Sequence, residues 1–260
     1  MPAPHNHLKS RLAKGEVLHG CWLGMADPYM AQIAATAGFD WLLIDGEHAP
    51  NDIRSIMAQL AVVEPSPSAA VVRLPDGDAA KIKQVLDIGA QTILVPMVES
   101  AEQARELVRA TRYAPQGFRG VGSALARASR FAAIPDYLTT ANEQICLIVQ
   151  VETVAGMAAL DDILGVEGVD GVFIGPSDLA ADMGHLGQAA HHAVKTAVLG
   201  GLRRIREAGK AAGVLVTDPA YIDDCRTAGA NFLGVGIDVT IFAGAMRRLA
   251  AEVATKKPTI

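Results

Sequence analysis

The chain repeats one pattern of positions: an amphipathic stretch, a glycine, and then a short run of apolar residues. Ala37-Gly38-Phe39-Asp40 leads into Trp41-Leu42-Leu43-Ile44, and Ile88-Gly89-Ala90 leads into Thr92-Ile93-Leu94-Val95. A glycine just after a helix can adopt the left-handed conformation that closes the helix at low cost. The runs that follow lack polar alternation, which is typical of strands buried on both faces. The pattern recurs with Gly213 before Val214-Leu215-Val216 and with Gly229 before Phe232-Leu233-Gly234-Val235.

Eight apolar runs of strand length occur along the chain, near residues 18–24, 41–45, 69–74, 92–96, 145–151, 171–175, 213–217 and 232–237. Amphipathic stretches separate them, including Asp52–Val62, Ala79–Asp87, Ala101–Arg112 and Ala190–Ala208. Strands that alternate with helices predict right-handed crossovers and a parallel sheet. Eight such units in 260 residues favour a single (β/α)8 barrel, the TIM barrel, over residues 1–260. An open doubly wound sheet is the alternative, but no G-x-G-x-x-G motif follows an early strand.

The stretch between Pro96 and Ile145 is longer than one helix requires, so a loop and helix insertion is expected after the fourth strand. The glycines of Gly117-Phe118-Arg119-Gly120-Val121-Gly122 break regular structure, and Ser123–Ala133 could form a short helix. Barrel enzymes use such insertions as lids over the site or as contacts between subunits. The sequence leaves both uses open.

Composition and charge narrow the class of protein. Apolar residues make up 50% of the chain, yet no apolar run approaches the ~20 residues that span a bilayer. The basic residues near the N-terminus are not followed by an apolar stretch, so no secretory signal is expected and a cytoplasmic location is predicted. The net charge of −5 argues against a nucleic-acid surface, which needs a basic patch. We therefore expect a barrel that acts on small molecules, without a membrane or nucleic-acid partner.

Polar side chains follow the apolar runs at the end where (β/α)8 barrels carry their active sites. In chain order they are Asp45, Glu47, His48, Arg73, Gln150, Glu152, Ser177, Asp178, Asp218 and Asp238. Because the carboxyl ends of all strands of a barrel meet at one face, these side chains are expected to converge there. That face is the candidate active site.

Glu152 and Asp178 follow the fifth and sixth strands, which are neighbours in a barrel. Two carboxylates in this position suit a hard divalent cation that keeps some waters and takes other ligands from substrate oxygens. The alternative is structural, because each carboxylate could cap the following helix or pair with an arginine. Asp178 lies in Gly-Pro-Ser-Asp-Leu, a typical helix start. From position alone, the two interpretations are equally supported.

Arg73 ends an apolar strand, where an unpaired guanidinium would be costly to bury. It suits an oxygen that gains negative charge during a reaction, or else a structural ion pair with Asp45 or Glu47. His48 lies in a loop and can act as a base near neutral pH. A lone histidine is more often incidental, but Asp45 and Glu47 could orient this ring.

No lysine follows a predicted strand. Lysines occur instead on helical stretches, near a helix end or at the termini, as Lys81, Lys83, Lys195 and Lys210 illustrate. An enzyme that works through a Schiff base needs a lysine that reaches the barrel interior. Schiff-base chemistry is therefore not expected here, and a metal would have to take the place of the imine.

Eight short sequence motifs occur in a fixed order along the chain. They are Leu23-Gly24 with Ala26-Asp27-Pro28, Ile44-Asp45-Gly46-Glu47-His48-Ala49-Pro50-Asn51, Val72-Arg73-Leu74-Pro75, Val95-Pro96-Met97-Val98, Arg119-Gly120-Val121-Gly122, Gln150-Val151-Glu152-Thr153, Gly175-Pro176-Ser177-Asp178-Leu179 and Gly234-Val235-Gly236-Ile237-Asp238. With them, nearly the whole chain resembles the metal-dependent (class II) pyruvate aldolases typified by 4-hydroxy-2-oxoheptanedioate aldolase, which belong to the phosphoenolpyruvate/pyruvate barrels. Each phrase alone is weak, but the ordered set is specific.

The resemblance implies a reaction and a set of roles around pyruvate. Glu152 and Asp178 match the family's metal ligands, for Mg²⁺, Mn²⁺ or Co²⁺, and Asp178 also borders the substrate. Gln150 matches a substrate contact, and Ser177 matches a position whose backbone amide, at a helix start, holds the pyruvate carboxylate. The reaction is the reversible aldol cleavage of a 4-hydroxy-2-oxo acid to pyruvate and an aldehyde through a metal-stabilised enolate. No nicotinamide, flavin or pyridoxal phosphate is implied.

The resemblance also assigns residues around the reacting carbons. Arg73 matches the residue that binds the substrate and stabilises the enolate, and His48 matches the general base. Trp22 and Leu215 match positions near the aldehyde part of the substrate.

Asp87 matches an aspartate that raises the basicity of the histidine. Since Asp87 lies late in the predicted helix Ala79–Asp87, it should lie at the opposite face of the barrel and act only from a neighbouring subunit or through an irregular helix end. The family's members are homo-oligomers, usually hexamers, so the resemblance implies a hexamer here.

Two other functions remain as alternatives. A carbon–carbon lyase of the malyl/citramalyl-coenzyme A type would keep the two-carboxylate metal site, but a longer chain and a basic surface for the nucleotide are then expected. A non-catalytic barrel that serves as a binding or regulatory subunit is the other. The intact set of His48, Arg73, Glu152 and Asp178 argues against that second alternative.

Overall fold

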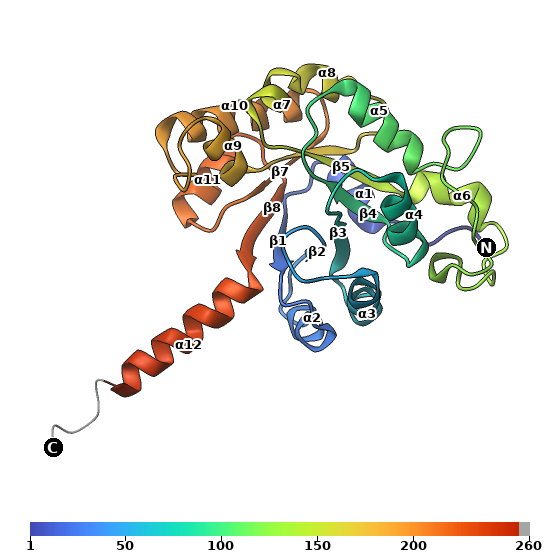
Figure 1. Ribbon diagram of the computed structural model, residues 1–260, viewed down its shortest axis with the longest axis horizontal. Coiled ribbons are helices and arrows are strands. Elements are labelled where there is room, and N and C mark those ends of the chain that lie inside the picture. Colours follow the sequence, from blue (N-terminus) through green and yellow to red (C-terminus); the bar gives the residue numbers. More distant parts are fainter. Residues whose placement is uncertain (255–260) are drawn as a thin grey trace.

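Eight parallel strands close into a barrel in sequence order in the computed structural model, which describes residues 1–254 (Figure 1). The strands are β1 Leu18–Leu23, β2 Trp41–Asp45, β3 Ala69–Arg73, β4 Thr92–Val95, β5 Cys146–Val151, β6 Gly171–Ile174, β7 Ala211–Leu215 and β8 Phe232–Ile237. All eight predicted strands are present, and β1 pairs with β8 to close the sheet. The predicted (β/α)8 barrel is therefore confirmed.

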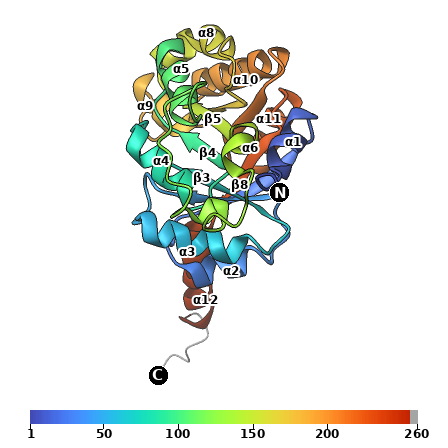
Figure 2. The ribbon, with the colours of Figure 1, turned by 90° about the vertical axis from the view of Figure 1, so that its right-hand side faces the viewer.

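Helices follow the strands and cover the outside of the barrel (Figures 1 and 2). They are α1 His7–Ala13, α2 Pro28–Ala34, α3 Ile53–Val63, α4 Ala79–Asp87, α5 Ala101–Ala110, the 3₁₀ turn η1 Arg127–Ser129, α6 Tyr137–Gln144, α7 Val154–Ala158, α8 Leu160–Leu164, α9 Pro176–Asp182, α10 His192–Glu207, α11 Pro219–Thr227 and α12 Asp238–Ala254. None of the helices in the described part of the chain is long and apolar enough to cross a membrane.

The glycine pattern predicted the strand starts well, with one error at β7. Gly38, Gly89 and Gly229 have φ values of 89°, 111° and 105°, as expected for glycines that close a helix. Gly213 instead lies inside β7, where a Cβ atom would collide with the ring of Phe173. The glycine that closes α10 is Gly209, with φ 75°. β7 therefore begins two residues before the predicted start.

Large aromatic rings and glycines share the barrel interior. The rings of Trp22, Trp41, Phe173 and Phe232 are in mutual contact; those of Trp41 and Phe232 stack with centroids 4.1 Å apart. A Cβ atom on Gly20 would collide with the ring of Trp41, so a glycine is required there. The interior is thus filled to its axis with side chains, as a packed core rather than a channel.

Helix α1, which the sequence pattern does not reveal, closes the barrel at the amino ends of the strands. Its buried residues Leu8 and Leu12 belong to the same apolar cluster as the interior rings. Asn6 caps the helix by accepting from Lys9 N, and its Nδ2 donates to Thr92 Oγ1 at 3.0 Å. A single buried side chain therefore ties α1 to the start of β4.

Residues 111–145 connect α5 to β5 at this same end of the barrel. The helix expected over Ser123–Ala133 is wrong: only the turn η1 forms, and Arg130, Phe131 and Ala132 follow it with φ values of 52°, 56° and 66°. Arg127 Nη1 donates to the carbonyl of Ile88, just before β4. The segment therefore cannot be a lid over the carboxyl-end face of its own barrel, and its use as a subunit contact stays a prediction.

Helix α12 leaves the barrel instead of folding back along it (Figures 1 and 2). None of its 17 residues is buried. Its apolar side chains Val239, Phe242, Met246, Leu249 and Val253 recur at intervals of three and four residues and are 42–58% exposed. This spacing places them on one face of the helix.

Candidate active site

A cavity of about 470 Å³ lies at the carboxyl ends of the strands. Eight of the nine predicted site residues line it, namely Trp22, His48, Arg73, Gln150, Glu152, Ser177, Asp178 and Leu215. The expectation that polar side chains at the strand ends converge is therefore confirmed for Asp45 and for six of these eight; Trp22 and Leu215 were expected here from the family resemblance. No lysine among residues 1–254 lines the cavity, and none was expected at a strand end.

An arginine–carboxylate cluster forms one wall of the cavity. Arg73 and Asp45 are paired across β3 and β2, and Arg73 donates from Nε and Nη2 to the two carboxylate oxygens of Asp45, at 2.9 and 2.6 Å. Arg73 Nη1 lies 2.9 Å from Glu47 Oε2. Both side chains predicted as ion-pair partners are thus used, and they hold the guanidinium plane rigidly at the edge of the cavity.

The loop after β2 positions His48. A Cβ atom on Gly46 would lie 2.6 Å from the carbonyl oxygen of Arg73, so only glycine allows this close passage. Asp45 Oδ1 accepts from Glu47 N at 3.0 Å and from His48 N at 3.4 Å. The His48 side chain is 67% exposed, and its Nε2 lies 3.8 Å from Glu47 Oε2. The ring therefore stands at the mouth of the cavity, where it can meet both solvent and a bound molecule.

Glu152 is held by backbone and side-chain donors at the bottom of the cavity. Its Oε1 accepts from Met97 N at 3.0 Å, and its Oε2 accepts from Gln150 Nε2. Met97 has φ 57°, a conformation that costs energy for a residue other than glycine and is found at functional sites. A Cβ atom on Gly175 would collide with Glu152 Oε2. The chain around Glu152 is therefore shaped to leave its carboxylate open to the cavity.

Burial and neighbouring negative charges dominate the electrostatics around Glu152. Burial raises the pKa of the Glu152 carboxyl, the hydrogen bonds from Gln150 and Met97 lower it, and the negative charges of Asp178 and Glu47 raise it further. Burial likewise raises the pKa of Glu47, against the opposing effect of Arg73. Gln150 Oε1 is buried without a hydrogen-bond partner. A cation with bound waters would relieve both the excess negative charge and the unpaired amide oxygen.

Asp178 does not act as a helix cap. Helix α9 begins with Gly175 in the cap position and has no side-chain cap, and Asp178 is the third residue of the helix. Its exposed carboxylate borders the cavity beside Glu152. No cluster of three or more His, Cys, Asp or Glu side chains with metal-binding geometry occurs in residues 1–254. Two carboxylates still fit a hard cation that takes its other ligands from water and substrate.

The remaining wall of the cavity is apolar and extends beyond the two residues predicted for it. Trp22 and Leu215 meet over Gly234, where a Cβ atom would lie 2.9 Å from Leu215 Cδ1 and 3.0 Å from Trp22 Cζ3. Ile237 and Val239 continue this wall. Position alone could have identified Ile237, which ends β8, but Val239 belongs to the last helix and carries no polar signal.

Asp87 lies apart from this cavity. It is the last residue of α4, at the amino ends of the strands, and its Oδ1 accepts from Arg119 Nη2 at 2.6 Å. Two other candidates from the strand ends have structural roles. Asp218 caps α11 by accepting from Tyr221 N, and Asp238 accepts from the amides of Gly24 and Met25.

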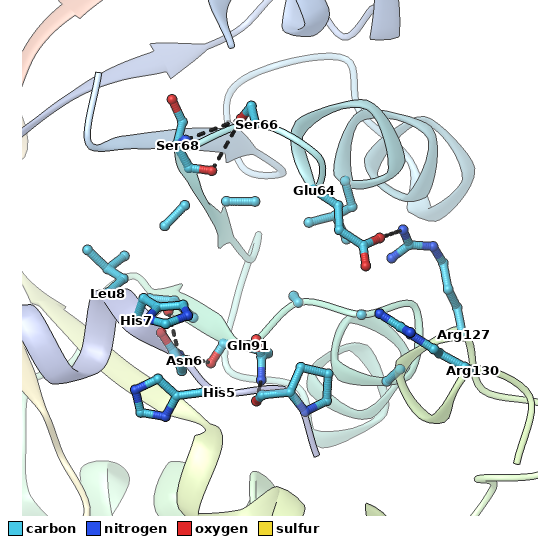
Figure 3. Close-up of a pocket in the computed structure, with 18 of the residues that line it drawn as sticks. His5, Asn6, His7, Leu8, Glu64, Ser66, Ser68, Gln91, Arg127 and Arg130 are labelled. Atoms are coloured by element: carbon cyan, nitrogen blue, oxygen red, sulfur yellow. Dashed lines mark hydrogen bonds and ion pairs between the residues drawn. The ribbon is translucent and has the colours of Figure 1, made fainter. Parts of the chain in front are cut away.

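A second cavity, of about 490 Å³, lies at the opposite end of the barrel, beside α1 and η1 (Figure 3). Its polar groups are largely engaged with each other. Asn6 Nδ2 donates to the carbonyl of Gln91 at 3.2 Å, and Arg127 forms an ion pair with Glu64. None of the predicted site residues lines it, so we place the active site in the carboxyl-end cavity.

A closed parallel barrel with buried carboxylates and an arginine at the carboxyl ends of its strands defines the class: a (β/α)8-barrel enzyme. The chain belongs to the HpcH/HpaI aldolase/citrate lyase family, whose model matches residues 18–245.

Individual relatives cover nearly the whole chain. Hydroxypyruvate/pyruvate aldolase of Roseovarius nubinhibens is 64% identical over 252 residues, which are 97% of this chain and 98% of the relative. 4-Hydroxy-2-oxo-heptane-1,7-dioate aldolase of Escherichia coli is 53% identical over 247 residues, 95% of this chain and 94% of the relative. The crystal structure of a family member from Burkholderia cenocepacia superposes with a TM-score of 0.92 at 41% identity, over 96% of this chain and 99% of that one.

Proposed function

We propose that this protein is a pyruvate-dependent aldolase, a carbon–carbon lyase that cleaves 4-hydroxy-2-oxo acids reversibly to pyruvate and an aldehyde. The observation that carries the proposal is one cavity that joins the carboxylates of Glu152 and Asp178 to the guanidinium of Arg73, with no lysine from the described part of the chain in its lining. The relatives that match nearly their full length to this chain are named aldolases. Their names favour this reaction over cleavage of a malyl- or citramalyl-coenzyme A thioester. The name of the Roseovarius relative suggests hydroxypyruvate as a further donor.

Glu152 and Asp178 would hold a divalent cation, Mg²⁺, Mn²⁺ or Co²⁺, because hard cations prefer carboxylate and water oxygens. The burial of Glu152, the negative charges near it, and Gln150 Oε1, which has no partner within residues 1–254, fit such an ion. When bound, the cation supplies Lewis-acid polarisation of the keto group. Gln150 and the backbone amide of Ser177 orient the pyruvate part of the substrate at the same end of the cavity.

His48 transfers the proton in this reaction, and Arg73 stabilises the negative charge that develops. In the direction of synthesis, His48 takes a proton from the pyruvate methyl group, and the electron pair of that C–H bond moves towards the keto oxygen. The rigid guanidinium of Arg73 stabilises the negative charge on that oxygen. The methyl carbon then bonds to the aldehyde carbon, and the aldehyde oxygen takes up a proton to give the hydroxyl. Cleavage follows the same steps in reverse.

Exchange of the pyruvate methyl protons tests this proposal without an aldehyde. We expect the protein with Mg²⁺, Mn²⁺ or Co²⁺ to exchange these protons in D₂O, measured by NMR, and His48→Ala to slow the exchange, because the variant lacks the base at the cavity mouth. Metal binding of His48→Ala, measured by calorimetry, should stay close to that of the parent protein. A parent protein that exchanges no protons with any of the three metals would refute the proposed function.

We also propose that the working unit is a homo-oligomer, with a hexamer as the expected assembly. The main support is α12, whose five apolar side chains face solvent although a (β/α)8 barrel normally buries its eighth helix. Exposed apolar patches of this kind mark sites of association. A second copy could accept α12 against the barrel side between β8 and β1. Val121, Leu125 and Phe131, which are 68–87% exposed, offer a second contact at the amino ends of the strands.

A contribution of Asp87 to catalysis would come from another copy, because Asp87 lies at the opposite end of its own barrel from His48. We expect His48→Ala and Asp87→Ala to be inactive alone, and co-expressed mixtures of the two to regain part of the activity. Some sites of a mixed oligomer would combine an intact histidine with an intact aspartate. Light scattering that finds a fully active monomer would contradict the assembly, and mixed oligomers that stay inactive would contradict the shared site.

A further inference from the structure

The cavity has two chemically different ends. The carboxylates and the amide of Gln150 lie on the side of β5 and β6, whereas Trp22, Leu215, Ile237 and Val239 form an apolar wall on the side of β7, β8 and β1. If the proposed function holds, pyruvate occupies the polar end. The apolar wall is then the surface that meets the aldehyde.

Val239 is the one residue of this wall that lies in a helix, since the other three lie in barrel strands. It is the second residue of α12 and is 42% exposed, so its isopropyl group stands at the rim rather than in the core. A Cβ atom on Gly24 would lie only 3.2 Å from Val239 Cγ2. The loop after β1 therefore approaches Val239 closely, and the two lie side by side at the rim of the cavity.

Asp238 joins the start of α12 to the loop after β1. Its Oδ1 accepts from Gly24 N at 2.8 Å, and its Oδ2 accepts from Met25 N at 3.2 Å. The neighbouring Ala26 has φ 55°, so the loop is also held in a backbone conformation that is costly for alanine. Because no residue of α12 is buried in this chain, the position of its first turn depends on these contacts.

We propose that Val239, at the start of α12, determines which aldehydes the site accepts. The proposal rests on the proposed function and adds the acceptor class to it: aldehydes with an unbranched carbon chain. A chain that is branched next to the carbonyl meets the isopropyl group of Val239, whose place the hydrogen bonds of Asp238 with Gly24 and Met25 fix.

The test compares kcat/KM for addition of pyruvate to propanal and to 2-methylpropanal. We expect Val239→Ala to raise the ratio of branched to unbranched aldehyde on the order of tenfold, since one or two methyl groups in a pocket are worth this much discrimination. Val239→Leu should change the ratio in the opposite direction. In both Val239 variants, the change in kcat/KM should come mainly from a change in the KM of the aldehyde. Val17→Ala is the matched control: Val17 is also 42% exposed but precedes β1 at the other end of the barrel.

Two results would overturn this inference. One is that the kcat/KM ratio of branched to unbranched aldehyde is the same in both Val239 variants as in the parent protein and in Val17→Ala. The other is a parent protein that prefers the branched aldehyde. Exchange of pyruvate methyl protons in the parent protein separates this failure from failure of the proposed function, because the exchange needs no aldehyde.

Discussion

Glu152→Gln should lower the rate of aldol cleavage by about 10³-fold. A divalent cation contributes several kcal/mol to stabilisation of the developing charge, and each ~1.4 kcal/mol corresponds to a factor of ten in rate. Glutamine keeps the size of the side chain but removes the negative charge that, with Asp178, would attract the cation. Glu102→Gln, an exposed position in α5, is the matched control and should keep full activity. The measurement is steady-state cleavage with metal titrated over a wide range.

Chelation of the parent protein gives the complementary result. We expect EDTA to abolish cleavage and Mg²⁺, Mn²⁺ or Co²⁺ to restore it, whereas Glu152→Gln should respond weakly to added metal. The raised pKa of Glu152 implies a pH dependence, because the carboxyl must lose its proton before it can bind a cation. Metal affinity should therefore fall as the pH is lowered. Full activity after removal of metal, or pyruvate trapped on a lysine by borohydride, would refute the metal site.

Arg73→Lys should lower activity by about 10²–10³-fold, the usual cost of removing one preorganised donor to an oxyanion. A lysine keeps the charge but cannot reproduce the planar fork that binds Asp45 through two nitrogens and still faces Glu47. The effect should appear in the exchange of pyruvate methyl protons as well as in cleavage, since both pass through the same charged oxygen. Arg54→Lys, exposed on α3, is the control.

The folded state of Arg73→Lys must be checked, because Arg73 is buried and its loss leaves Asp45 with a poorer partner. Thermal unfolding and calorimetric titration with metal provide that check. A folded variant that binds metal and exchanges pyruvate protons at the parental rate would remove Arg73 from the mechanism.

Much of the fold and site could be predicted because the signals are local and repeated. The strands are short apolar runs that directly follow a helix-closing glycine, as at Gly38 and Gly89, so their starts can be placed closely. Once the barrel is assigned, its geometry brings the strand ends together whatever the intervening sequence. This is why residues as distant in sequence as Arg73 and Asp178 could be placed in one cavity.

The failures occur where long-range packing decides the structure. Gly213 has the same neighbours as a helix-closing glycine, but its place inside β7 is set by the ring of Phe173 across the barrel. The three left-handed residues after η1 are alanine, arginine and phenylalanine, which give no local signal for that conformation. Val239 is an ordinary apolar residue in a helix, and only the path of α12 brings it to the cavity.

The projecting helix links the stability of the protein to its association. A helix of 17 residues is about 25 Å long, and the apolar face of α12 stays exposed in a single barrel. This face therefore adds almost nothing to the free energy of folding of a lone barrel. If α12 packs against a second copy, as proposed, its burial stabilises the assembly instead. The midpoint of thermal unfolding should then rise with protein concentration.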